Sequence, residues 1–375
     1  MRISRLALHD FRSYEDVDLA LSPGPVCFVG ANGQGKTNLV EAIDYLSRLE
    51  SHRVSSEAPL VRAGCDSAIV RVEAVKDDRP ALIEVELRPG RTNRARINRA
   101  DLSRPRDLLG VVRTVLFSPE DLALVKGDPA QRRRFLDDLL VMESVRVAGI
   151  KSDYERTVRQ RNTLLKTSRG RQVDLSTLEI WDDKLASLGG EIMARRLRTL
   201  DALAPYLQER HAGVAASAAE RRQTVTAVYE CRAAGDSADL PRVADACREL
   251  LLAAITERRR DERDRGLTLV GPHRDELALS IGGLPAKGYA SHGESWSLAL
   301  ALKLASFDRL RVDDDPILIL DDVFAELDTG RRDHLAGMTH DVEQVLVTAA
   351  VVDDVPDALR GHRFVVADGE ATPDE

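Results

Sequence analysis

The strongest constraint on this chain is a glycine-rich stretch, residues 30–37, that fits the pattern GxxxxGK[ST]. The apolar residues 26–29 before it are typical of a buried strand, and residues 38–43 after it begin a helical pattern. A strand, a glycine loop and a helix are the context that this pattern requires. Chance alone gives such a match in a chain of this length on the order of one time in a hundred. The sequence therefore predicts a nucleotide-binding loop.

This loop supplies most of the expected contacts with the nucleotide. Its backbone N–H groups turn toward the β- and γ-phosphates at a helix N-terminus, where the helix dipole also favours negative charge. Lys36 adds a positive charge that assists catalysis, and Thr37 adds a hydroxyl for Mg²⁺. The residues expected to bind the nucleotide here are Gly30, Ala31, Asn32, Gly33, Gln34, Gly35, Lys36, Thr37 and Asn38.

A second stretch, residues 316–322, has the character of the other half of such a site. Four apolar residues are followed by Asp321 and Asp322. We predict a buried parallel strand whose C-terminal tip holds Asp321 near Mg²⁺. Asp322 would then orient or deprotonate the attacking water. The alternative is a core strand that is followed by an acidic turn and has no part in a site. The intact phosphate loop makes this alternative the weaker interpretation.

Composition limits the class of protein. The chain has 375 residues, 43% of them hydrophobic, and 54 basic against 62 acidic residues, a net charge of −8. Any nucleic-acid surface must therefore be a local patch. The four cysteines are far apart and form no CxxC pair, and no apolar run reaches membrane-spanning length. These features favour a cytoplasmic protein in a reducing compartment, with neither a membrane segment nor a cysteine metal site.

The spacing of apolar and charged residues divides the chain into three segments. Residues 1–125 and 263–375 have strand patterns around the two motifs, whereas residues 126–262 have apolar residues at helical spacing among dense charges. We expect two parts of one ATPase head that flank an inserted helical lobe. Because sustained heptads are absent, and because residues 167–174 and 212–219 interrupt the pattern, we expect several moderate helices rather than one long coiled coil.

Residues 88–106 contain seven arginines opposed only by Asp101. A basic hairpin that contacts the DNA backbone through Arg94, Arg96 and Arg99 is one interpretation. A solvated charged edge that discourages strand pairing is an equally weighted alternative. His52 and Arg53, in the irregular stretch after the first helix, are expected to be solvated.

Two later segments also carry polar residues next to predicted elements. Ser291 and Gly293 precede a helical run from residue 296 and predict a second helix N-terminus that favours anions. Residues 271–275 contain His273 and Arg274, which are candidate ligands, although a Gly-Pro turn with charged residues is more often a connection at a domain boundary.

The order of these motifs resembles the ABC-type ATPase heads of the SMC group, and within that group it is similar to the RecF family. The resemblance covers nearly the whole chain and rests on residues 10–14, 32–38, 117–122, 271–277 and 321–328 and on the Ser291 segment. It implies an α/β fold: an ABC-type, SMC-like P-loop ATPase head with an inserted helical lobe.

The resemblance also implies a function. RecF-family proteins are ATP-dependent DNA-binding proteins with slow ATPase activity, which work with RecR and RecO at gaps and single-strand/double-strand junctions to promote RecA loading. ATP with Mg²⁺ lies between two subunits of a homodimer. By resemblance, Asp321 supports Mg²⁺, Asp322 is the catalytic carboxylate, Ser291 and Gly293 contact the γ-phosphate bound by the partner, and Asp328 belongs to a loop crossing the interface.

Some positions depart from the family pattern. Glutamines often flank the signature glycine, but here they are His292 and Glu294. No obvious glutamine follows Phe117, and Glu120 is the residue expected near that place; Thr348 replaces the switch histidine of ABC transporters. Two alternatives stay open: a transporter nucleotide-binding subunit, and a DNA-structural module that uses ATP only to hold a dimer together.

Overall fold

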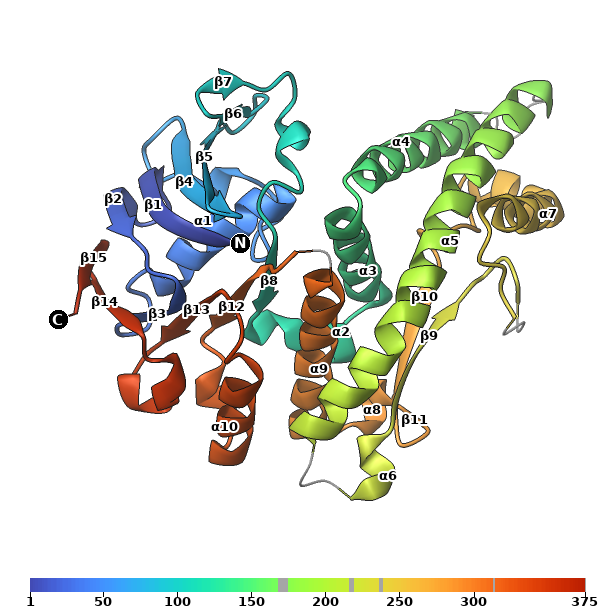
Figure 1. Cartoon of the computed structure of the whole chain (residues 1–375). Coiled ribbons are helices and arrows are strands. Elements are labelled where there is room, and N and C mark those ends of the chain that lie inside the picture. The colour runs from blue at the N-terminus through green and yellow to red at the C-terminus, as the bar shows by residue number, and fades with distance from the viewer. Residues whose placement is uncertain (168–174, 216–218, 236–238, 313, 375) are drawn as a thin grey trace. The chain divides into compact units, whose positions relative to one another are not determined.

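The computed structural model describes residues 1–167, 175–215, 219–235, 239–312 and 314–374. Its residues form two compact units (Figure 1). The first contains Met1–Leu122, the stretch from Trp296 onward and a short segment that begins at Glu209. The second contains Ala123–Gln208 and the segment that ends at Ser295. Both halves of the predicted phosphate site thus belong to the first unit, and most of the expected interruption at 167–174 lies outside the described residues.

A mostly parallel sheet in the first unit brings the two motifs to one edge. Its order is β15-β14-β3-β13-β12-β8, and only β15 is antiparallel to its neighbour. Every residue of β12 and β13 is buried, as expected for parallel strands covered on both faces. The strands are β3 (Gly24–Val29), β8 (Thr114–Phe117), β12 (Ile317–Asp321), β13 (Gln344–Ala349), β14 (His362–Ala367) and β15 (Glu370–Pro373).

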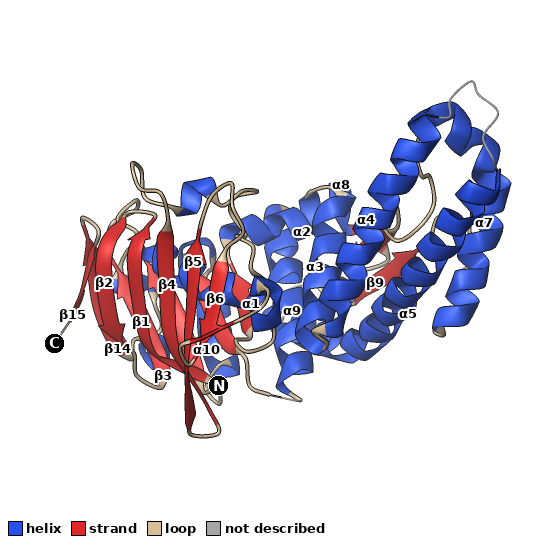
Figure 2. Ribbon diagram, turned by 90° about the horizontal axis from the view of Figure 1, so that it is seen from above, coloured by secondary structure: helices blue, strands red, loops and turns tan. Residues whose placement is uncertain are grey.

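The second sheet of this unit is antiparallel, in the order β2-β1-β4-β5-β6-β7, and Figure 2 shows β2, β1, β4, β5 and β6 side by side. Buried and exposed residues alternate along β4, so one face of the sheet covers the core and the other meets solvent. The strands are β1 (Arg2–Phe11), β2 (Tyr14–Ala20), β4 (Ala68–Lys76), β5 (Arg79–Leu87), β6 (Arg94–Ile97) and β7 (Ala100–Asp101).

Helix α1 (Lys36–Arg48) lies in the core of the first unit, because it contacts β1 of the antiparallel sheet as well as β8, β12 and β13 of the parallel sheet. Leu39, Ile43 and Leu46 have no exposed surface and belong to one hydrophobic cluster with both sheets. The helix that starts at the phosphate loop is therefore fixed from two sides. The other α-helices with residues in this unit are α2 (Leu122–Lys126), α9 (His292–Arg311), α10 (Thr329–Met338) and the end of α5 (Leu175–Val214) from Glu209 onward.

The second unit is mainly helical, with a small antiparallel sheet in the order β11-β10-β9. The strand β9 lies inside the segment predicted to be helical, so that prediction was wrong there. Its elements are α3 (Pro129–Glu143), α4 (Arg146–Thr167), α5 (Leu175–Val214), α6 (Glu220–Gln223), β9 (Val225–Glu230), α7 (Ala244–Arg265), β10 (Glu276–Ile281), β11 (Leu284–Pro285) and α8 (Ala286–Tyr289).

The expectation of only moderate helices was also wrong, because α5 runs for 40 residues. Two glycines in its interior serve packing rather than ending the helix. A Cβ atom on Gly190 would lie 2.7 Å from the carbonyl oxygen of Ala244, and one on Gly189 would lie 2.9 Å from a methyl group of Leu251. The glycine pair therefore allows α7 to approach α5 closely, which a hydrophobic pattern alone does not indicate.

None of the helices among the described residues combines the length and the apolar character needed to cross a membrane.

Candidate nucleotide-binding site

The phosphate loop joins β3 to α1, and two of its glycines are required by close packing. A Cβ atom on Gly30 would lie 2.1 Å from the carbonyl oxygen of Val366. Gly35 has φ of 110°, and a Cβ atom there would lie 2.8 Å from the Ser13 hydroxyl. Larger residues at either position would clash with fixed neighbours or strain the backbone.

The N-terminus of α1 is open to an anion. Gly35 is its N-cap residue and has no side chain to satisfy the first N–H groups, and the first turn contains no acidic residue. Unsatisfied N–H groups and the positive end of the helix dipole together favour phosphate at this place. The backbone arrangement is that predicted from residues 30–37.

Lys36 lies folded over the loop. Its ammonium group donates hydrogen bonds to the carbonyl oxygens of Gly30 (2.7 Å) and Ala31 (3.1 Å) and to the side-chain oxygen of Asn32 (3.3 Å). Burial lowers the pKa of Lys36, while the nearby Asp322 and Asp321 act in the opposite direction. A buried cation that is held only by neutral oxygens is well suited to exchange them for phosphate oxygens.

Asp321 and Thr37 come together although they are 284 positions apart. The Thr37 hydroxyl donates to Oδ1 of Asp321 at 2.9 Å, and the Thr348 hydroxyl donates to the same oxygen at 2.6 Å. Burial raises the pKa of Asp321, and these two hydrogen bonds oppose the increase. Mg²⁺ in nucleotide sites uses one or two protein oxygens besides phosphates and water. The Thr37 and Asp321 oxygens therefore fit Mg²⁺.

Asp322 follows with its backbone in the left-handed region, at φ of 53°. This conformation is unfavourable for a residue other than glycine, so the surroundings must hold it. Its N–H group donates to the Thr348 hydroxyl at 2.9 Å and to the Thr348 carbonyl oxygen at 3.2 Å. Thr348, which the sequence identified only as a departure from transporters, thus contacts the carboxylate of Asp321 and the backbone of Asp322.

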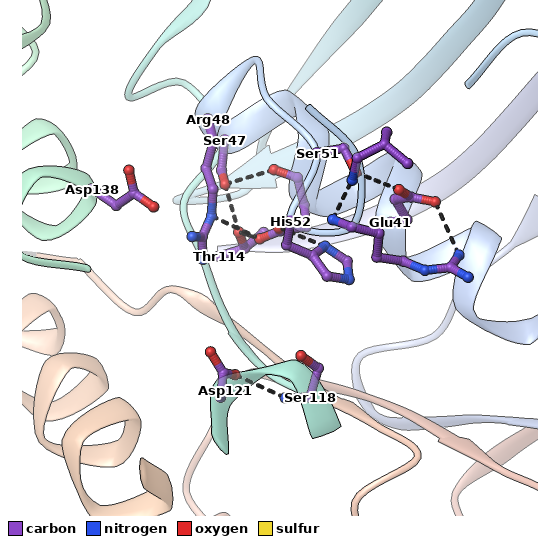
Figure 3. A network of polar contacts seen from close by, with 12 residues as sticks. Glu41, Ser47, Arg48, Ser51, His52, Thr114, Ser118, Asp121 and Asp138 are labelled. Atoms are coloured by element: carbon purple, nitrogen blue, oxygen red, sulfur yellow. Dashed lines mark hydrogen bonds and ion pairs between the residues drawn. The ribbon is translucent and has the colours of Figure 1, made fainter. Parts of the chain in front are cut away.

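Figure 3 shows part of a network of polar contacts around Glu41, and this network also reaches Asn38 at the end of the loop. Glu41 has no exposed surface and accepts hydrogen bonds from Arg12 at 2.6 and 2.9 Å and from Ser51 at 2.6 Å. Arg53 lies 3.4 Å from Glu41 and donates to the side-chain oxygen of Asn38 at 3.1 Å. Arg53 is exposed, as expected, but its pairing with the buried carboxylate of Glu41 is not visible in the local sequence.

His52, unlike Arg53, was wrongly expected to be solvated. Its side chain is 11% exposed, and its Nδ1 atom lies 3.5 Å from the carboxylate of the fully buried Asp44. Burial alone would raise the pKa of Asp44, but Arg48 and His52 hold it well below its usual range. The charge of His52 also lowers the pKa of Asp321, whereas that of Glu120 raises it. Glu120 therefore acts electrostatically on Asp321, and its expected place near that of a glutamine stays a prediction.

The signature residues begin α9. The Ser291 hydroxyl accepts from the backbone N–H of Glu294 at 3.2 Å, and the Glu294 carboxylate accepts from the N–H of Ser291 at 2.8 Å. This reciprocal pair is a capping box, and its S-x-x-E pattern was present in the sequence. Glu294, which departs from the family pattern, therefore stabilises the start of the helix that carries Gly293. Glu294 also lies 3.3 Å from Arg222 of the same unit.

The remaining predicted residues are placed in the first unit. Asp328 is the exposed N-cap residue of α10 and accepts from the N–H of Arg331 at 3.0 Å.

The predicted basic hairpin consists of β6 and β7. On it, Arg96 lies 2.6 Å from Asp101 and 3.2 Å from Glu84, and Arg94 lies 3.6 Å from Glu86. Arg99 is in the turn between the strands, with φ of 69°.

Comparison with known proteins identifies the family. Residues 2–363 match the family described as RecF/RecN/SMC N terminal domain. The chain is 55% identical to the DNA replication and repair protein RecF of Streptomyces avermitilis, with 98% of this chain and 99% of the relative covered. It is also 55% identical to the protein of the same name from Frankia alni, with 99% of each covered.

Solved structures agree with this relationship. The structure of the recombination mediator protein RecF-ATP in RecFOR pathway superposes with a TM-score of 0.90 at 27% identity, covering 100% of this chain and 97% of that one. An Smc head bound to the C-winged helix domain of ScpA gives a TM-score of 0.55 at 17% identity over 100% of this chain and 97% of that one, a likeness of fold alone. The predicted ATPase head fold is thus confirmed.

Proposed function

The chain belongs to the RecF family, and we propose that it is a recombination mediator in DNA replication and repair that binds ATP and, with it, DNA. The single observation that carries this proposal is the contact between the phosphate loop and the tip of β12, where the Thr37 hydroxyl lies 2.9 Å from Oδ1 of Asp321. The ATP-bound relative of the same fold supports ATP as the nucleotide. The predicted division of the chain at residues 125 and 262 stays a prediction.

We propose that the protein hydrolyses ATP slowly in the presence of DNA. The α1 N-terminus and Lys36 would hold the phosphates, and Thr37 and Asp321 would hold Mg²⁺, which neutralises charge on the phosphate oxygens when bound. The charge of Asp322 acts on the pKa of Lys36, and Asp322 would orient the attacking water or accept its proton. Thr348 would keep both carboxylates in place.

The active form is proposed to be an ATP-dependent homodimer. Ser291 and Gly293, at the start of α9, would contact the γ-phosphate held by the partner subunit, and Asp328 would lie in the loop that crosses the interface. RecR and RecO are proposed partners by family resemblance, with DNA gaps or junctions as the substrate. Arg94, Arg96 and Arg99 remain the proposed DNA contacts, and pairing of Arg96 with two carboxylates would weaken its share.

Sedimentation with and without ATP and DNA tests these proposals together. Wild-type protein is expected to form a dimer with ATP and to bind DNA in that form. Lys36→Ala should lose both properties, because the buried ammonium is replaced by a methyl group that cannot hold phosphates. Lys76→Ala is the matched control, since Lys76 is 49% exposed and pairs with Asp314. A Lys36→Ala variant that still dimerises with ATP would contradict the sandwich mechanism.

A further inference from the structure

The second unit contains a groove of about 1250 Å³ that the nucleotide site does not use. Its walls are the beginning of α3, the end of β9, the end of α7 and residues 267–276, elements that Figure 1 labels within one unit. Residues 271–275, the Gly-Pro-His-Arg-Asp stretch, lie along it and have no part in the proposed ATP reaction. The groove is therefore a separate feature of the helical unit.

Buried side chains hold this wall rigid. Arg196 is 3% exposed, pairs with Asp137 at 2.7 Å and donates to the carbonyl oxygen of Pro272 at 2.8 Å. The Tyr229 hydroxyl donates to the buried carboxylate of Asp275 at 2.7 Å. The backbone that carries His273 and Arg274 is thus fixed before any ligand arrives, which reduces the entropy lost on binding.

The groove has an excess of unpaired positive charge. Among its four carboxylates, Glu276 is neutralised by Arg132 at 2.8 Å, and Asp261 lies 3.9 Å from Arg258. Within the described part of the chain, four of its arginines have no carboxylate at ion-pair distance. Burial and the neighbouring Arg196 lower the pKa of Arg133, whereas the charges of Glu276, Asp137 and Asp275 act in the opposite direction. The five arginines that line the groove are Arg133, Arg232, Arg258, Arg265 and Arg274.

The rest of the lining distinguishes between kinds of polyanion. Val228 and Leu267 are apolar and 52% and 36% exposed. Tyr229, the one aromatic ring of Phe, Tyr or Trp type in the lining, is only 6% exposed, so the groove offers no platform on which nucleic-acid bases can stack. Glu230 would also repel a continuous row of phosphates. Carboxylates spaced by apolar side chains match this surface better than a phosphodiester chain does.

The backbone of β9 offers a further contact. In the three-stranded sheet β9 lies at one end, so among the described residues no strand pairs with its outer edge. At the start of that edge, Gln208 accepts from the N–H of Val225 at 3.1 Å, while the groove lies at the other end of the strand. An extended peptide can add to an open strand edge of this kind.

We propose that this groove binds an extended segment of a partner protein in which acidic residues alternate with apolar residues. The carboxylates pair with Arg232, Arg265 and Arg274, and the apolar side chains cover Val228 and Leu267. This binding is independent of the ATP site and goes beyond the function proposed above.

A fluorescent peptide in which glutamate alternates with leucine and valine tests the proposal by anisotropy with the full-length protein. The double variant Arg232→Glu with Arg265→Glu reverses two exposed charges of the groove. Arg159→Glu with Arg260→Glu makes the same change in net charge at exposed positions outside the groove, on α4 and α7. The groove variant should bind at least about tenfold more weakly than wild type, and the control should bind like wild type.

Two results would overturn the proposal. One is equal peptide affinity in the groove variant and the control variant. The other is a set of three observations: wild type binds labelled oligothymidylate without ATP, the groove variant does not, and wild type has no affinity for the peptide. That result would make the groove a nucleic-acid site. Equal melting temperatures of the two variants would show that the charge reversals do not act by unfolding the unit.

Discussion

Replacing Arg161 by methionine is expected to destabilise the second unit by about 3 to 4 kcal/mol. Arg161 has no exposed surface and lies 2.8 Å from Asp182 and 2.5 Å from Glu262, which are 4% and 0% exposed. It also donates to the Thr268 hydroxyl at 2.9 Å. The change leaves two buried carboxylates without this partner, and breaking such a pair costs about 3–5 kcal/mol. We expect the lower part of that range because Arg259 still lies 2.9 Å from Asp182.

Hydrogen–deuterium exchange of α4 and α7 measures this loss in the second unit alone, which bulk unfolding of a chain with two units does not. Arg156→Met on the same helix is the control, because Arg156 and its partner Asp153 are 57% and 47% exposed, and such pairs contribute less than about 1 kcal/mol. The reasoning is refuted if the amides of α4 and α7 exchange as slowly in Arg161→Met as they do in Arg156→Met.

A triple variant separates loss of a contact from burial of an unpaired charge. Arg161→Met with Asp182→Leu and Glu262→Leu removes all three charges and should recover at least half of the lost stability, since apolar replacements of a complete buried ion network are often tolerated. A triple variant that is less stable than Arg161→Met alone would mean that the network contributes net attraction. The network also supports the groove, because Glu262 accepts a hydrogen bond from the N–H of Leu269, a groove residue, at 2.7 Å.

Three further outcomes are expected. Asp322→Asn should abolish ATP turnover and keep ATP-induced dimerisation in sedimentation; turnover like that of wild type would point to Glu326 or another base. Ser291→Arg should bind ATP in equilibrium dialysis yet stay monomeric, and a dimer would mean that the signature is misplaced. Burial lowers the pKa of His273 to about 4, so stability is complete above its ordinary pKa of about 6.5 and falls by up to about 3 kcal/mol as pH drops toward 4. His273→Gln should flatten that pH dependence in hydrogen exchange of the second unit, and an unchanged slope would assign it to another group.

The phosphate loop was predictable because its chemistry is local. Glycines, a lysine and a threonine at fixed spacing are enough to form a phosphate cradle at the start of a helix. The tip of β12 was predictable for a similar reason, since an apolar run that ends in carboxylates is typical of a buried parallel strand. The capping box of Ser291 and Glu294 was equally local, and its pattern could have been recognised.

The sequence by itself thus determined which residues form the proposed phosphate and metal site, and the fold class that brings them to one sheet edge. Only the tertiary structure decided how they are oriented. Thr348 reaches Asp321 and Asp322 from the neighbouring strand, Glu41 gathers Arg12 and Arg53 around the loop, and a glycine pair lets α5 continue past α7. These contacts join residues far apart in the chain, and each depends on which side chains share a buried space. Local patterns of hydrophobicity and charge do not contain that information.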